Sequence, residues 1–226
     1  MKKILTTAIL CAGLVGFTAC DSFLDEEPKS SLTLDTYYKT SADIIGNVNY
    51  LYRDGAPDKM GNMTGAYRGS SLSVMNMVTG YFVNEYEGQE VDCSYARQLT
   101  RQNFTQSCCN YLTNDTWKGC YKSINVANAV IKYVDGVEMD GQAQYKAEAR
   151  FFRALNYFYL VKMFGDVPMI TEPTEDATLV EYPARTAASE VYKTVIIPDL
   201  QFAVENLPDA TFAGNSHRVT KYAADM

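Results

Sequence analysis

The sequence has little with which to hold a metal ion or a nucleic acid. It contains one histidine, His217, in 226 residues, which disfavours sites that need two or more imidazoles, as most zinc hydrolases do. Its 20 lysines and arginines are outnumbered by 27 aspartates and glutamates, so the formal net charge is −7. Nucleic-acid binding needs a basic surface that releases counterions from phosphates. No nucleic-acid partner is therefore expected.

Metal-binding spacings are also missing. The sequence has no Cys-x-x-Cys pair, and the acidic segment from Asp135 to Asp140 lacks the alternating oxygen ligands of a calcium loop. We therefore predict neither a metal nor a cofactor.

Only the N-terminus carries a long apolar run. Lys2 and Lys3 precede an apolar stretch that ends at Phe17, too short to span a bilayer comfortably and typical of an export signal. Small residues before Cys20 are typical of a bacterial lipoprotein, although Phe17 stands where leucine is usual. We predict that residues 1–19 are removed and that Cys20 is lipidated. Ordinary signal cleavage nearby is the alternative.

Residues 20–40 are predicted to form a polar tether before a helical domain over 41–226. The tether contains an acidic run, Asp25 to Glu27, in front of Pro28. This run has two interpretations. It is a solvated linker, or it is a signal for export to the outer surface of the cell.

Four cysteines remain after the signal and the lipidated residue. An exported chain with four cysteines allows three pairings that the sequence does not choose between. The adjacent Cys108 and Cys109 do not suit a bond with each other without strain. Buried thiols or one disulfide are favoured among Cys93, Cys108, Cys109 and Cys120.

The rest of the chain is predicted to be helical. Ser41 is a candidate cap for a first helix with an apolar stripe at Ile44, Val48 and Leu51. A second helix opens at Trp117 and stops before Asp135-Gly136. Longer apolar patterns predict helices over 142–164 and 187–206, and the start of another after a Thr220 cap.

Two positions should shape the later helices. Gly165 ends the helix over 142–164, and Pro198 should kink or split the next one at Ile197. The fold class is all-α, with tetratricopeptide-like helix pairs. Because the last helix barely opens before Met226, we expect a fold truncated after the start of its second pair.

Between about Gly55 and Tyr111 the helical periodicity fades into a long irregular region. Glycines interrupt it, and tyrosines lie among amide and hydroxyl side chains. A long irregular segment that mixes aromatic rings with polar side chains is more often functional than structural filler. Alternatively, these rings pack the loop onto the scaffold. The candidate ligand-binding residues are Tyr67, Tyr81, Asn84, Tyr86, Tyr95 and Arg97, with Gln89, Gln102 and Phe104 as further members of the segment.

Several polar residues lie where a helical interior is expected. Asn128, on an apolar face, should be a satisfied interhelical group. Arg153 should pair inside the scaffold, and Glu148 should meet neighbours three or four residues away. Trp117, at core spacing, is expected to pack rather than to bind a ligand. His217, beside Arg218, should lie in a solvated turn.

Four separated motifs follow Phe23-Leu24-Asp25 in order and span most of the chain. The motifs are Trp117…Tyr121-Lys122-Ser123-Ile124-Asn125-Val126-Ala127-Asn128, Ala147-Glu148-Ala149-Arg150-Phe151-Phe152-Arg153-Ala154-Leu155 running into Phe164-Gly165-Asp166-Val167-Pro168, Val191-Tyr192…Ile197-Pro198-Asp199-Leu200…Ala203…Leu207-Pro208, and Arg218-Val219-Thr220-Lys221. Together they resemble the SusD/RagB family of Bacteroidetes outer-membrane lipoproteins. The resemblance matches only the N-terminal half of that family, and Tyr222 stands where a small residue is usual.

The resemblance implies a function. Such proteins are not enzymes; they sit at the cell surface as a lid over a SusC-like TonB-dependent transporter and capture oligosaccharides, or peptides in the RagB branch. Two other classes stay open from the residues: a surface glycoside hydrolase using two carboxylates and a pure interaction scaffold. Hydrolysis of an oligosaccharide would favour the first, and transporter binding without ligand binding would favour the second.

Overall fold

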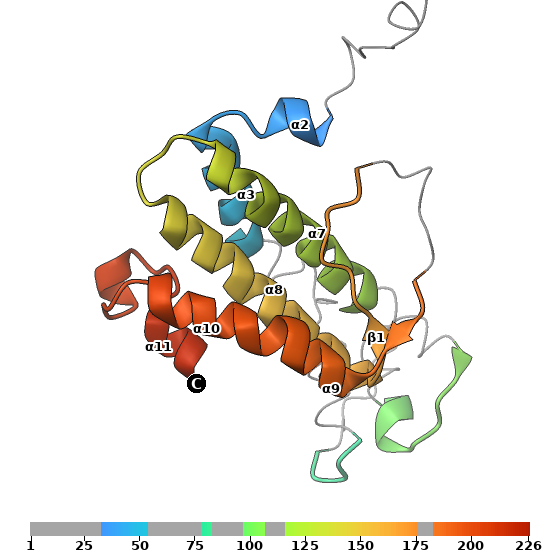
Figure 1. The fold of residues 1–226 in the computed structure, drawn as a ribbon. Coiled ribbons are helices and arrows are strands. Elements are labelled where there is room, and N and C mark those ends of the chain that lie inside the picture. Colours follow the sequence, from blue (N-terminus) through green and yellow to red (C-terminus); the bar gives the residue numbers. More distant parts are fainter. Residues whose placement is uncertain (1–32, 54–77, 83–96, 107–115, 176–182) are drawn as a thin grey trace, which may run out of the picture. The chain divides into compact units, whose positions relative to one another are not determined.

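The computed structural model describes residues 33–53, 78–82, 97–106, 116–175 and 183–226 (Figure 1). The helical body is the compact unit Leu34–Met226. The predicted signal peptide and Cys20 lie outside the described residues. Residues 34–40, the last part of the segment predicted as a tether, fall in this same compact unit.

The described part of this body is mostly helical, which confirms the all-α prediction. One short antiparallel pair of strands accompanies the helices, with Val167 opposite Thr186 and Pro168 opposite Arg185. The elements are α2 (Leu34–Tyr37), α3 (Ser41–Arg53), α7 (Lys118–Tyr133), η2 (Val134–Gly136), α8 (Gln142–Phe164), β1 (Val167–Pro168), β2 (Arg185–Thr186), α9 (Ala188–Val191), the π-helical η4 (Tyr192–Ile196), α10 (Ile197–Asn206), η5 (Ala213–Asn215) and α11 (Lys221–Asp225).

Helix α8 lies at the centre of the body. Its bounds match the helix predicted over 142–164, and glycines with positive φ stand at both ends, Gly141 at 71° and Gly165 at 69°. L-residues rarely adopt these backbone angles, which is why glycine marks the two boundaries. Helices α3, α7 and α10 all pack on α8 (Figure 1), so its nearly continuous apolar surface is buried on several sides.

Two apolar clusters form the core along α8. One surrounds Val48, Val130 and Phe152, where α3, α7 and α8 meet. The other surrounds Ile124, Tyr157 and Val195, where α7, α8 and η4 meet. Each cluster therefore draws on helices that are far apart in the sequence, and α7 and α8 contribute to both.

A π-helical turn interrupts the regular α-helix of the run over 188–206 just before Pro198, at the place where a kink or a split was predicted. The residue lies in the first turn of α10, directly after the π-helical turn η4. Proline has no N–H, and its ring clashes with the carbonyl four residues earlier, so a regular α-helix does not continue through it. The wider π turn before Ile197 absorbs this conflict.

The start of α3 corrects one prediction. Ser41 is the first helical residue and not its cap. Thr40 and Asp43 bond each other instead: the Thr40 N–H donates to Asp43 Oδ2 at 2.8 Å, and the Asp43 N–H donates to Thr40 Oγ1 at 3.4 Å. This reciprocal arrangement is a capping box with aspartate in the third helical position.

The segment before this cap packs on the helical body. Tyr38 is buried, and its ring stacks on that of Tyr133 with centroids 5.2 Å apart. The Tyr133 hydroxyl also donates to Asp35 Oδ1 at 2.7 Å. These contacts hold α2 against the C-terminal end of α7.

Thr220 occupies the cap position of α11 with an extended backbone, but its side chain makes no capping hydrogen bond. The position predicted for the cap is therefore confirmed and its hydrogen bond is not. Along the described stretches of the chain, no helix combines the length and the apolar character needed to cross a membrane.

Candidate functional site

Two of the six predicted ligand-binding residues lie in described segments. Tyr81 is 89% exposed, and its neighbour Phe82 is 54% exposed. Arg97 is half-buried and opens the segment 97–106. The other four, Tyr67, Asn84, Tyr86 and Tyr95, fall outside the described residues.

The segment 97–106 has one buried apolar side chain and one exposed aromatic ring. Leu99 is buried, whereas Phe104 is 56% exposed. Thr105 Oγ1 donates to Gln98 Oε1 at 2.7 Å, and Gln102 adopts a positive φ of 55°. Backbone hydrogen bonds from Arg101 to Arg97 and from Asn103 to Gln98 hold the segment, and it exposes the Phe104 ring to solvent.

Trp117 is packed, as predicted for a core residue. Its ring lies 5.1 Å from both the Tyr121 ring and the Phe164 ring. The guanidinium of Arg185 lies 5.9 Å from the Trp117 ring centroid and donates to the carbonyl of Asp166 at 2.8 Å. The tryptophan therefore joins α7, the end of α8 and β2.

One cluster of buried charges lies between α7, α8 and α10. Arg153 Nε donates to Asp199 Oδ2 at 2.6 Å, and its Nη2 donates to Asp199 Oδ1 at 2.9 Å. Its remaining Nη1 donates to Asn128 Oδ1 at 2.9 Å, and Asn128 donates to the carbonyl oxygens of Ile170 and Glu172 at 3.0 and 3.2 Å. These bonds confirm the predictions for Arg153 and Asn128.

Asp199 meets a second cation. Arg150 Nε lies 3.8 Å from Asp199 Oδ1, and the Arg150 guanidinium lies 4.2 Å from the Phe202 ring centroid. Arg150 Nε itself is buried without a hydrogen bond. One buried carboxylate therefore faces two guanidinium groups from α8.

Glu148, on the same helix, pairs with a residue 70 positions later. Its carboxylate accepts Arg218 Nε at 3.0 and 3.1 Å and Arg218 Nη2 at 2.5 Å. The predicted helical neighbour, Gln144, also donates to it at 3.1 Å. No pattern in the sequence pointed to this pairing with Arg218, whereas His217, predicted to lie in a solvated turn, is exposed.

Two tyrosines enclose Arg218. Its guanidinium lies 4.8 Å from the Tyr52 ring centroid and 5.4 Å from that of Tyr145, and Nη1 donates to Asn49 Oδ1 at 2.9 Å. The Tyr52 hydroxyl accepts the Val219 N–H at 3.0 Å. Burial, together with the Glu148 charge, raises the pKa of Tyr52 well above its usual range. Arg218 thus fastens the chain after α10 to α3 and α8.

The ion pairs of Glu148 and Asp199 limit what the buried carboxylates can do chemically. Glu148 and Asp199, the two buried carboxylates of the described chain, are each hydrogen-bonded to an arginine. Within the described segments, no three His, Cys, Asp or Glu side chains are placed to hold a metal ion. The buried carboxylates therefore serve as structural ion pairs.

Cys120 is a free, fully buried thiol. Burial raises its pKa to about 12, which keeps it protonated and unreactive at neutral pH. Of the four cysteines considered for pairing, Cys93, Cys108 and Cys109 lie outside the described residues.

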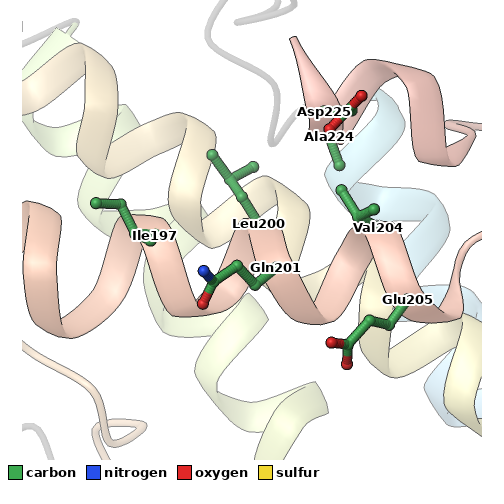
Figure 2. Close-up of a pocket in the computed structure, with 7 residues that line it drawn as sticks. All are labelled: Ile197, Leu200, Gln201, Val204, Glu205, Ala224 and Asp225. Atoms are coloured by element: carbon green, nitrogen blue, oxygen red, sulfur yellow. The ribbon is translucent and has the colours of Figure 1, made fainter.

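A surface groove of about 470 Å³ lies between α10 and α11 (Figure 2). Five of its residues follow one face of α10, and two come from the end of α11. We call it the α10–α11 groove. It is lined by Ile197, Leu200, Gln201, Val204, Glu205, Ala224 and Asp225.

A family of SusD-like proteins, described as starch-binding and associating with the outer membrane, matches residues 22–225. The chain belongs to the SusD-like family. The match covers all of the described helices, including the segments that carry both buried ion pairs.

Curated relatives from two organisms agree with this membership. The chain is 31% identical over 216 residues to SusD-like protein P2 of Formosa agariphila, covering 94% of this chain and 40% of that protein. It is 28% identical over 229 residues to a SusD-like protein of Bacteroides ovatus, covering 98% and 36%. The chain thus spans about two fifths of the length of these SusD-like relatives.

Solved structures show the same fold. A SusD superfamily protein from Parabacteroides distasonis is 26% identical, with a TM-score of 0.61 over 80% of this chain and 36% of that one. A laminarin-binding SusD-like protein is 25% identical, with a TM-score of 0.64 over 83% and 38%. These similarities confirm the SusD-like architecture predicted from the motifs.

Proposed function

We propose that this SusD-like chain belongs to a cell-surface lipoprotein that binds oligosaccharides and passes them to a SusC-like TonB-dependent transporter without hydrolysing them. The observation that carries the proposal is the SusD-like match over residues 22–225, to a family described as starch-binding and associating with the outer membrane. Laminarin binding by a relative of 25% identity supports a glycan as the ligand.

The exposed rings of the irregular region favour a glycan. Tyr81, Phe82 and Phe104 expose much of their surface on segments that lie outside the helical elements. A pyranose presents a flat C–H face that packs on such rings, while neighbouring amide and charged groups bond its hydroxyls. Tyr67, Asn84, Tyr86, Tyr95 and Arg97 complete the proposed ligand-binding set.

The interior carboxylates favour binding over hydrolysis. Glycoside hydrolysis uses one carboxyl group as a proton donor and a second as a nucleophile or base. Glu148 and Asp199 are committed to Arg218 and Arg153, so neither is free for such a role.

A gel-mobility experiment tests the ligand proposal. The chain is run through native gels containing laminarin, xyloglucan or starch, and retardation reports binding. We expect retardation by at least one glycan and roughly 10-fold weaker binding for Tyr81→Ala, about the value of one lost stacking contact. Tyr222→Ala, which removes an exposed ring on α11, is the matched control and should bind normally.

The outcomes separate the competing functions. Retardation by none of the glycans together with binding to a mixed peptide pool would contradict the glycan proposal. Release of reducing sugar during incubation would contradict the non-catalytic role.

The anchor and the partner are proposed from the N-terminal sequence and the family. Residues 1–19 are the proposed lipoprotein signal, Cys20 the lipid-bearing residue, residues 20–40 the tether, whose last part from Leu34 packs on the helices, and residues 41–226 the helical domain. A lipid on Cys20 would hold the protein at the outer membrane, since two or more acyl chains give stable anchoring. The chain would then lie beside its transporter.

Metabolic labelling with a fatty acid tests the anchor. Wild-type protein should carry the label in the outer-membrane fraction, and Cys20→Ser should lose it and become soluble. Co-purification of a TonB-dependent transporter with the wild-type protein is expected. Label that persists in Cys20→Ser would rule out this residue as the anchor.

A further inference from the structure

The connection between α10 and α11 carries an exposed aromatic ring on its surface. Phe212 is 59% exposed, and it precedes the short turn η5. The imidazole of His217 stands against it, with ring centroids 5.2 Å apart and an angle of 72° between the ring planes. We call residues 211–217 the η5 loop. Its two rings form a corner that leaves more than half of Phe212 open to solvent.

Hydrogen bonds within the η5 loop hold this corner in place. The His217 N–H donates to the Phe212 carbonyl at 2.9 Å, and the Asn215 N–H donates to the Thr211 carbonyl at 3.0 Å. The Gly214 N–H donates to Thr211 Oγ1 at 3.1 Å, and a Cβ on Gly214 would lie only 2.9 Å from the same oxygen. The loop is therefore closed by its own bonds, and a larger residue at position 214 would disturb it.

Two residues of the η5 loop have a backbone conformation that L-residues rarely adopt. The φ angle is 50° at Ser216 and 63° at His217. Glycine at either position would relieve the strain, but the chain carries a hydroxyl and an imidazole there. Residues held in such conformations occur preferentially at sites that bind ligands. Here the strained pair is what returns the His217 ring to Phe212.

The composition of the η5 loop suits a neutral ligand that carries hydroxyl groups. Residues 210–217 contain no Asp, Glu, Lys or Arg, in a chain whose formal net charge is −7. The side chains of Thr211 and Ser216 are exposed hydroxyls, and an imidazole adds nitrogen atoms that bond hydroxyl groups. A pyranose has the complementary surface, since its flat C–H face packs on an aromatic ring while its edge bonds polar groups.

We propose that the η5 loop is a second carbohydrate-binding site, in which a pyranose stacks on Phe212 and bonds the imidazole of His217. The hydroxyls of Thr211 and Ser216 flank this position. The choice of a sugar rests on the proposed glycan-binding function, but the η5 loop shares no residue with the ligand-binding set around Tyr81. Two sites on one chain would hold a long polysaccharide more tightly than either site alone.

The chain contains a single histidine, which makes a direct test possible. In the untagged 226-residue protein, the imidazole C–H signals of a heteronuclear NMR spectrum come from His217 alone. Oligosaccharides of laminarin, xyloglucan and starch are titrated separately at constant pH. We expect at least one of them to shift the His217 signals in a saturable way.

Substitutions of Phe212 test the stacking contact. Phe212→Leu keeps an apolar side chain but removes the flat ring, and it should weaken the binding seen at His217 about 10-fold. Phe212→Trp restores a flat ring and should retain the binding, which separates stacking from any change in the stability of the loop. The matched control is Tyr222→Ala, because it removes a ring of similar exposure (55%) outside the η5 loop. It should leave the titration unchanged.

Tyr81→Ala separates this inference from the function proposed above. This variant should be retarded less in the glycan gels, yet its His217 signals should still shift. Signals that no glycan moves, in a chain that the gels do retard, would overturn the second site and leave the proposed function standing. Absence of both retardation and shift would remove both.

Three further results would contradict the second site. An undiminished shift in Phe212→Leu would exclude stacking on this ring. A shift that disappears in Tyr81→Ala would show that the η5 loop belongs to the first site or responds to it. His217 signals that respond to the mixed peptide pool and to none of the glycans would make Phe212 a contact for a protein.

Discussion

Two buried ion pairs connect α8 to different parts of the chain. Arg153 and Asp199 join α8 to α10 inside the helical core, where Asn128 and Arg150 add further contacts. Glu148 and Arg218 join α8 to an irregular segment after α10, where aromatic rings of Tyr52 and Tyr145 surround the arginine. The first pair links regular helices to one another, whereas the second fastens a loop to them.

The arginines of the two ion pairs differ in how much of their side chains solvent reaches. The Arg153 side chain is 10% exposed and that of Arg218 is 23% exposed, while both carboxylates are almost fully buried. Water can partly solvate Arg218 if it loses its partner, but hardly reaches Arg153. An unpaired charge should therefore cost more at the first site than at the second.

Removing Asp199 should have the largest effect. In Asp199→Ala, Arg153 stays buried without its carboxylate, and the free energy of unfolding should fall by about 3–5 kcal/mol. Urea denaturation measures the loss. A matched control is Asp209→Ala, which removes an exposed carboxylate bonded to Lys221 and should change the midpoint little.

A second variant separates charge from packing at this site. Replacing Arg153 and Asp199 together by Met and Leu should recover much of the loss, because buried pairs exchanged for apolar residues of similar size are often near neutral. A double variant as unstable as Asp199→Ala would show that the hydrogen bonds to Asn128 matter more than the unpaired charge.

Removing Glu148 should have a smaller and more local effect. Glu148→Ala leaves Arg218, whose side chain is 23% exposed, without its carboxylate, and we expect a loss of about 2 kcal/mol. Because this pair fastens the segment after α10, α11 amides should lose protection from hydrogen exchange while α7 and α8 amides keep theirs. Uniform loss of protection across all helices would erase the distinction between the two pairs.

The exposed carboxylate of Asp43 should stabilise the fold less than either buried ion pair does. Its partners are local, and Thr40→Ala should lower the free energy of unfolding by about 1 kcal/mol or less. Bonds from the Thr40 hydroxyl and then the Thr40 N–H lower the pKa of Asp43. Its contribution to stability is therefore complete above the unfolded-state pKa, about 3.9, and is lost as pH falls through the lower folded-state value.

A pH series checks this sign. The difference in unfolding midpoint between wild type and Asp43→Asn should be constant near neutral pH and shrink below about pH 4. A difference that grows as the solution becomes more acidic would contradict the capping role.

The helices themselves followed from the sequence to a large extent. The bounds of α8 could be predicted because glycine at both ends permits a positive φ that other residues disfavour. The irregular turn before α10 could be predicted because Pro198 has no N–H to donate. At α3 the prediction was one residue off, since Thr40 and Ser41 are both good caps and only the bond to Asp43 distinguishes them.

Less of the candidate site than of the helices could be predicted from the sequence. Rings such as Tyr81 could be singled out as residues of an irregular region, but their placement depends on long-range packing. The motif Arg218-Val219-Thr220-Lys221 was visible, yet the bond from Arg218 to Glu148 spans 70 residues and leaves no periodic signal.

The sequence by itself determined the family, the helical class and the positions where helices begin, break and end, because these depend on local backbone preference and on side chains a few residues apart. Only the tertiary structure decided that Arg153 faces Asp199, that Arg218 reaches Glu148, and that α11 enters a groove along α10. Those contacts bring together segments separated by 46, 70 and about 20 residues. Their partners are chosen by burial, since a charge removed from water is stable only beside its counterpart.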